Sequence, residues 1–109
     1  MKNQETKDLV FKQLDMIYNA VEDTAKQFGT KIIPTNLIEK AVNIGKIDIK
    51  KLSKDTPAKG FFIEYNKLLD EVVTQCKKDA SDMSTTKIPL LLFESHIDVI
   101  KSSFKTGLN

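Results

Sequence analysis

Residues 5–28 of this chain, ETKDLVFKQLDMIYNAVEDTAKQF, decide its fold class. Apolar residues recur in this stretch at alternating steps of three and four, which is the spacing of one face of an α-helix. Glu5 and Asp8 lie in the first turn, where the helix dipole favours negative charge, and Gly29 follows as a C-terminal cap. The stretch therefore predicts a long amphipathic helix. Its apolar stripe consists of Val10, Leu14, Ile17, Val21, Ala25 and Phe28, with Leu9, Phe11 and Tyr18 beside it.

Three further segments show helical spacing, and we expect helices over about 36–44, 57–79 and 87–105. Gly45 is interpreted as the end of the first of these helices, because glycine is common just after the last helical residue. The sequence shows no repeat of fixed period between the segments.

Residues 46–53 are ambiguous. Ile47 and Ile49 alternate with polar residues as in a strand, whereas Asp48 could cap a short turn of helix that reaches Ser53. An isolated strand has no partner here, so we expect the helical turn.

Four amphipathic helices joined by connections of about five to twelve residues predict an antiparallel bundle. The apolar stripes must meet one another, because each large apolar side chain contributes about 1.5 to 3 kcal/mol only when it is buried. We therefore expect an all-α fold. It is a single domain spanning residues 1–109, with four main helices and a short extra helical turn.

The chain carries 17 lysines, no arginine and 15 acidic residues, for a formal net charge of +2. Arginine supplies the planar fork of donors that clamps phosphate or reads guanine, so its absence argues against these modes of recognition. The polar N-terminus lacks the apolar core of a secretory signal, and no apolar run approaches the length of a membrane span. A lone cysteine fits a reducing compartment. We expect a cytoplasmic protein.

Catalytic and metal-binding patterns are sparse. Cys76 and His96 could form a dyad between neighbouring helices, but Cys76 continues an apolar stripe and is interpreted as a buried structural thiol. His96 has no second ligand at metal-binding spacing, and Glu94 and Asp98 are interpreted as a solvated helix edge. We therefore expect no enzyme activity, no cofactor and no metal site.

The leading hypothesis is a non-enzymatic protein that binds another protein, including a second copy of itself as a homodimer. It would serve as an adaptor, inhibitor, chaperone or immunity factor. The helices carry more large apolar residues than a narrow bundle seam requires, which leaves some of them available for an exposed patch. The candidate residues for this patch are Leu9, Phe11, Phe62 and Leu92.

The alternative hypothesis is a nucleic-acid-binding regulator. Positive charge is densest over residues 46–59, where lysine ammonium groups could bind phosphate with little sequence preference. The candidate residues are Lys46, Lys50, Lys51, Lys54 and Lys59.

Two stretches, KIIPT at residues 31–35 and GKIDIKKL at residues 45–52, resemble part of the immunity proteins of class II bacteriocins. These proteins are lysine-rich four-helix bundles in the cytosol. The resemblance implies a protein that protects a producer cell by engaging a membrane receptor or its bacteriocin complex from inside. The matched residues make up less than a fifth of the chain, and no functional residue is carried over from them.

Overall fold

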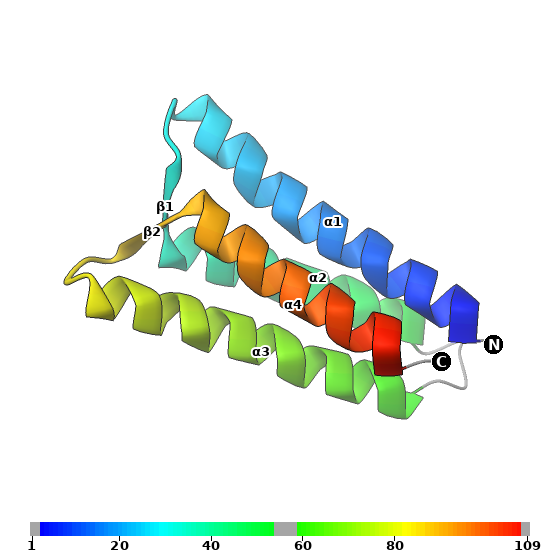
Figure 1. Ribbon diagram of the computed structural model, residues 1–109. Helices are drawn as coiled ribbons and strands as arrows, with labels where there is room; N and C mark the ends of the chain where they lie inside the picture. The colour runs from blue at the N-terminus through cyan, green and yellow to red at the C-terminus, as the bar shows by residue number, and fades with distance from the viewer. Residues whose placement is uncertain (1–2, 54–58, 108–109) are drawn as a thin grey trace.

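The computed structural model describes residues 3–53 and 59–107, and it describes side chains within residues 8–51 and 62–103. Four helices lie side by side, with two short strands at one end of the bundle (Figure 1). The elements are α1 (Asn3–Gln27), β1 (Ile32–Pro34), α2 (Thr35–Ser53), α3 (Lys59–Asp82), β2 (Lys87–Pro89) and α4 (Leu90–Gly107). The predicted all-α helical bundle is therefore confirmed.

The helices form a ring in which α1 and α3 each pack against both α2 and α4. Most of the buried side chains come from the predicted stripes, and together with Ile33, Ile49 and Ile88 they form one hydrophobic cluster. Phe28 is the exception in the first stripe, because the structure leaves it exposed. Gly29 follows α1 with a φ of 64°, the left-handed conformation expected of a glycine cap.

The second helix is longer than predicted. It runs without interruption from Thr35 to Ser53, so the expected end at Gly45 is wrong and residues 46–53 form its last turns. Gly45 is buried because α2 approaches α1 closely there. A Cβ atom at this position would lie 2.5 Å from Ile17 Cδ1. Ile49 is buried on the same face, whereas Ile47 is exposed, as helical spacing requires.

The other boundaries differ less. The first helix spans residues 3–27 instead of 5–28, and the third continues to Asp82 instead of 79. The predicted start of the third helix at residue 57 lies outside the described residues. The last helix begins at Leu90 instead of 87, because residues 87–89 form a strand.

The two strands, which were not expected, pair antiparallel with Ile33 opposite Ile88. Both isoleucines are fully buried and join the hydrophobic cluster. Each strand leads directly into the following helix. The pairing therefore fixes the start of α2 next to the start of α4.

The second half of the chain repeats the first half at a spacing of 55 residues, the separation of the paired residues Ile33 and Ile88. Each half consists of a long helix, a short strand and a second helix. Gly29 and Ser84, which this spacing relates, both follow the first helix of their half with positive φ, 64° and 56°. The expectation of no fixed repeat is thus wrong. Exchanging the halves maps the strand pairing onto itself, so a pseudo-two-fold axis passes through the Ile33 and Ile88 pair.

Backbone hydrogen bonds between the halves follow this symmetry. The Thr35 N–H donates to the Thr86 carbonyl at 3.0 Å, and the Leu90 N–H donates to the Lys31 carbonyl at 2.8 Å. The 55-residue spacing converts one bond into the other, since it relates Thr35 to Leu90 and Lys31 to Thr86.

Ion pairs between the halves are equivalent in the same way. Lys46 of α2 pairs with Asp70 of α3, and Lys101 of α4 pairs with Asp15 of α1. The lysines are identical at equivalent positions, and so are the aspartates. The positions that are identical in both halves, within residues 3–53 and 59–107, are Lys12 and Lys67, Leu14 and Leu69, Asp15 and Asp70, Ala25 and Ala80, Thr30 and Thr85, Ile33 and Ile88, Pro34 and Pro89, Leu37 and Leu92, Glu39 and Glu94, Lys46 and Lys101, and Lys50 and Lys105.

Candidate functional site: the cleft between α1 and α4

A cleft of about 790 Å³ lies between the C-terminal half of α1 and the start of α4. Its walls include the apolar side chains of Ala25, Pro89, Leu90 and Leu91. Its polar groups include the Tyr18 hydroxyl and the carboxylates of Glu22 and Glu94. An apolar cleft with a few convergent polar groups is the usual form of a binding site. We refer to it as the α1–α4 cleft.

Tyr18 holds the polar groups of this cleft together. Its hydroxyl lies 2.9 Å from Glu94 Oε2 and 3.2 Å from Glu22 Oε2. Its ring stacks on the buried ring of Phe93, with the centroids 6.0 Å apart and an angle of 18° between the planes. Burial raises the pKa of the Tyr18 hydroxyl far above its ordinary value, and the Glu94 carboxylate raises it further. Tyr18 is therefore a neutral donor with a single proton for two carboxylates.

The two carboxylates differ in their other partners. Lys26 lies 3.4 Å from Glu22 Oε1, with its own side chain 72% exposed. Within residues 8–51 and 62–103, no lysine forms an ion pair with Glu94. The exposed Lys31 also lines the cleft. Glu94 is thus half-buried, and its hydrogen-bond donor among the described side chains is the Tyr18 hydroxyl. The same hydroxyl also faces Glu22.

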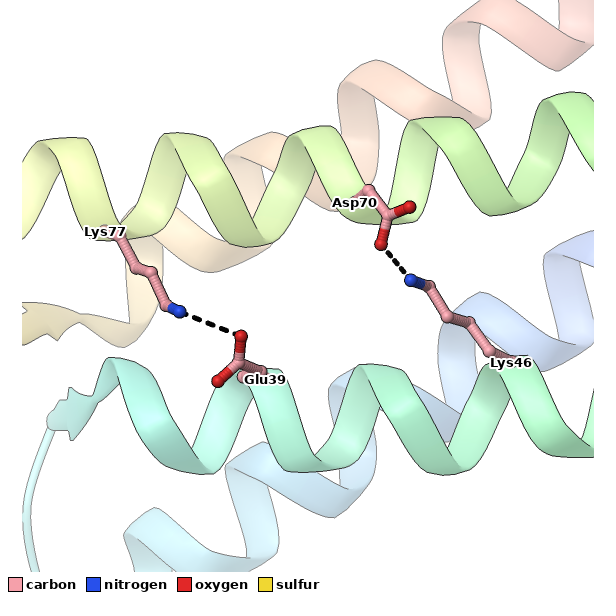
Figure 2. A network of polar contacts seen from close by, with 4 residues as sticks. All are labelled: Glu39, Lys46, Asp70 and Lys77. Carbon is pink, nitrogen blue, oxygen red and sulfur yellow. Dashed lines mark hydrogen bonds and ion pairs between the residues drawn. The ribbon is translucent and has the colours of Figure 1, made fainter.

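The pseudo-two-fold axis relates this cleft to a groove between α2 and α3. At equivalent positions, Glu39 corresponds to Glu94, Lys77 to Glu22 and Val73 to Tyr18. In the α2–α3 groove, Lys77 Nζ binds Glu39 Oε2 at 2.8 Å (Figure 2). In this groove an ammonium group of the same chain therefore neutralises the glutamate. The other groove has a second carboxylate and a tyrosine in the corresponding places.

The predicted apolar patch is not formed by the residues proposed for it. Phe62 is buried in the core with 2% of its surface exposed. Leu9, Phe11 and Leu92 are half-buried and pack against the core. These residues lie on the broad apolar stripes, and the stripes are wide because each helix of the ring packs against two neighbours.

Three of the five lysines of the alternative hypothesis have described side chains, and all three lie on α2. Lys46 pairs with Asp70 across α2 and α3 (Figure 2). Lys50 also has an interaction partner, and Lys51 is exposed. Lys54 lies outside the described residues, and so does the side chain of Lys59.

The Cys76 and His96 dyad is not formed either. Cys76 is fully buried, and burial raises the pKa of its thiol to about 12. His96 Nε2 lies 2.8 Å from Asp79 Oδ2, so the partner of the imidazole is a carboxylate of α3 and not the Cys76 thiol. This hydrogen bond is the main cause that lowers the pKa of Asp79.

Calcium sites in helix–loop–helix pairs need several loop oxygens, most of them from carboxylates. The connections over residues 28–34 and 83–89 contain no acidic residue, so this donor set is missing. Within the described side chains, no three His, Cys, Asp or Glu groups lie close enough to share a metal ion. None of the described helices combines the length and apolar content of a membrane span.

Comparisons of the chain with protein-family models, curated proteins and solved structures gave no significant match. The internal comparison between the two halves therefore supplies the reference for the site. Its signal was present in the sequence as Thr30, Ile33, Pro34 and Glu39, which recur as Thr85, Ile88, Pro89 and Glu94.

Proposed function

We propose that the protein acts without catalysis, by binding another protein at the end of the bundle that carries the strands. This role would make it an adaptor, inhibitor, chaperone or immunity factor. The observation that supports the proposal is a set of large apolar side chains that lie in water at this end. Phe28 is 71% exposed, Leu91 is 70% exposed and Ile32 is 49% exposed. We call these three residues the strand-end surface.

Two clefts meet at the strand-end surface. Leu91 lines the α1–α4 cleft, and Phe28 and Ile32 line a second cleft of about 700 Å³ with Pro34 and Leu37. Thr30 lines both clefts, so they adjoin. Exposed apolar groups beside concave apolar walls are typical of surfaces that bind a polypeptide segment, because its side chains remove both from water.

The test is a selection of random displayed peptides on the wild-type protein, with the Phe28→Asp and Leu91→Asp variants as matched targets. Both substitutions lie at exposed positions and leave the core intact. We expect selected peptides with apolar side chains, and each substitution should weaken their binding by about tenfold. Ile47→Asp on the outer surface of α2 is the control and should have no effect. Peptides that bind all four proteins equally would contradict the proposal.

A further inference from the structure

We infer that the α1–α4 cleft binds a cationic group on an apolar stem, and that Glu22 and Glu94 are its two acceptors. The source to which we commit is a lysine or arginine side chain of a partner polypeptide. That choice of source rests on the proposed function, whereas the affinity of the cleft for the cation does not. The two carboxylates would make the cleft prefer a cationic group over an uncharged apolar group, which the apolar walls alone do not do.

The first argument is the hydrogen-bond balance of the cleft. Glu22 Oε2 and Glu94 Oε2 both face the Tyr18 hydroxyl, which has only one proton to donate. At any moment one of these two contacts lacks its proton. An ammonium group has three donors, and a guanidinium group has five. Either group could therefore bind both carboxylates and leave the Tyr18 contact in place.

The second argument is the internal reference. The α2–α3 groove shows that this fold accepts an ammonium group beside the glutamate at the equivalent position, because Lys77 binds Glu39 there at 2.8 Å. In the α1–α4 cleft the lysine is replaced by Glu22, which adds a negative charge where the other half has a positive one. Glu94 therefore corresponds to the carboxylate of the Lys77 and Glu39 pair, but Glu22 stands in the place of the lysine. Charge complementarity favours a cation from another molecule.

The third argument concerns shape and competition. The apolar walls from Ala25, Pro89 and Leu90 match the methylene stem of a lysine, which binds apolar surface while its charged end stays on polar groups. Lys26 and Lys31 are the internal competitors. Lys26 contacts Glu22 Oε1 and not the oxygen that faces Tyr18, and among the described side chains the exposed Lys31 forms no ion pair with Glu22 or Glu94. The Lys26 side chain is mostly in water, so a ligand can displace it at little cost.

The test uses butylammonium, which reproduces the end of a lysine side chain, and 1-butanol as its uncharged analogue. Binding is followed by NMR titration of the wild-type protein, with Glu94→Gln and Glu22→Lys as variants. We expect butylammonium to bind about tenfold more tightly than butanol, and Glu94→Gln to remove most of this difference. Glu22→Lys should abolish binding, because its own ammonium group would then pair with Glu94 as Lys77 pairs with Glu39.

Glu39→Gln in the α2–α3 groove is the matched control and should leave butylammonium binding unchanged. Equal binding of butylammonium and butanol by the wild-type protein would overturn the inference. So would an unchanged preference in Glu94→Gln when its melting curve shows an intact fold. One outcome is that butylammonium binds as expected while no peptide is selected at the strand-end surface. In that case the cleft binds a cation, and the claim that a partner polypeptide supplies this cation is wrong. If selected peptides lack lysine and arginine, the proposed function stands and the choice of a partner's lysine or arginine as the source of the cation is wrong.

Discussion

Gly45 shows how a single residue can be misinterpreted from its type alone. Glycine usually marks the end of a helix, but here it allows α2 to lie against the side chain of Ile17. In the other half, Ile100 occupies the place of Gly45 and the smaller Val72 occupies the place of Ile17. The two halves thus exchange a small and a large residue across equivalent helix contacts.

Gly45→Ala should lower the free energy of unfolding by about 1 to 2 kcal/mol, because overpacking against Ile17 outweighs the better helix propensity of alanine. Denaturant unfolding measures this effect. Combining Gly45→Ala with Ile17→Val, which removes the Cδ1 methyl, should recover part of the loss. A stabilised single variant would mean that the close approach is absent.

Cys76 should be protected in the native state. Its thiol is fully buried and its pKa is raised to about 12, so little of the reactive thiolate forms at neutral pH. We expect an alkylating reagent to modify it only after denaturation, as mass spectrometry would show. Rapid modification of the native protein would revive the hypothesis of a catalytic thiol.

Asp79 should make stability depend on pH on the acid side. Its pKa is lowered in the folded state, mainly by the hydrogen bond with His96, so its contribution is present above the ordinary value near 3.9. That contribution is lost as the pH falls through the lower folded value. The stability advantage of wild type over Asp79→Asn should therefore shrink between about pH 5 and about pH 2. With His96→Ala in both proteins the advantage should lose most of this pH dependence, and an unchanged profile would contradict the assignment.

At the scale of elements, apolar spacing predicted the existence and type of all four helices, because each stripe had to find a buried partner. It could not predict the two strands, since three residues are too few to show a period. It also could not predict that residues 46–53 continue α2, because that depends on a contact with Ile17 of another helix.

The strands should contribute equally to stability, since Ile33 and Ile88 lie opposite each other and are both fully buried. We expect Ile33→Ala and Ile88→Ala each to cost about 2 to 5 kcal/mol of unfolding free energy. Thermal or denaturant unfolding of both variants checks this. A cost that is large on one strand and negligible on the other would contradict the equivalence of the halves.

At the scale of the whole molecule, the two halves are joined by symmetry-related backbone hydrogen bonds and ion pairs. They differ in charge at the α1–α4 cleft, where Glu22 replaces the lysine of the other half. The residues of this cleft were not predicted as a site. Tyr18 was assigned to the edge of an apolar stripe and Glu94 to a solvated helix edge. Neither assignment could reveal that the two side chains meet across helices. The 55-residue spacing was the only sequence signal that could have aligned Glu94 with Glu39, and Glu22 with Lys77.

The most direct measurement is an NMR titration of the Lys77→Glu variant with butylammonium. The substitution gives the α2–α3 groove the carboxylate pair of its counterpart, at a side chain that is 48% exposed. We predict a second binding site, with shifts at Thr35 and Thr86 beside those at Leu91, because these residues line the two related clefts. Shifts confined to the α1–α4 cleft, with the variant folded, would contradict the claim that the carboxylate pair creates the site.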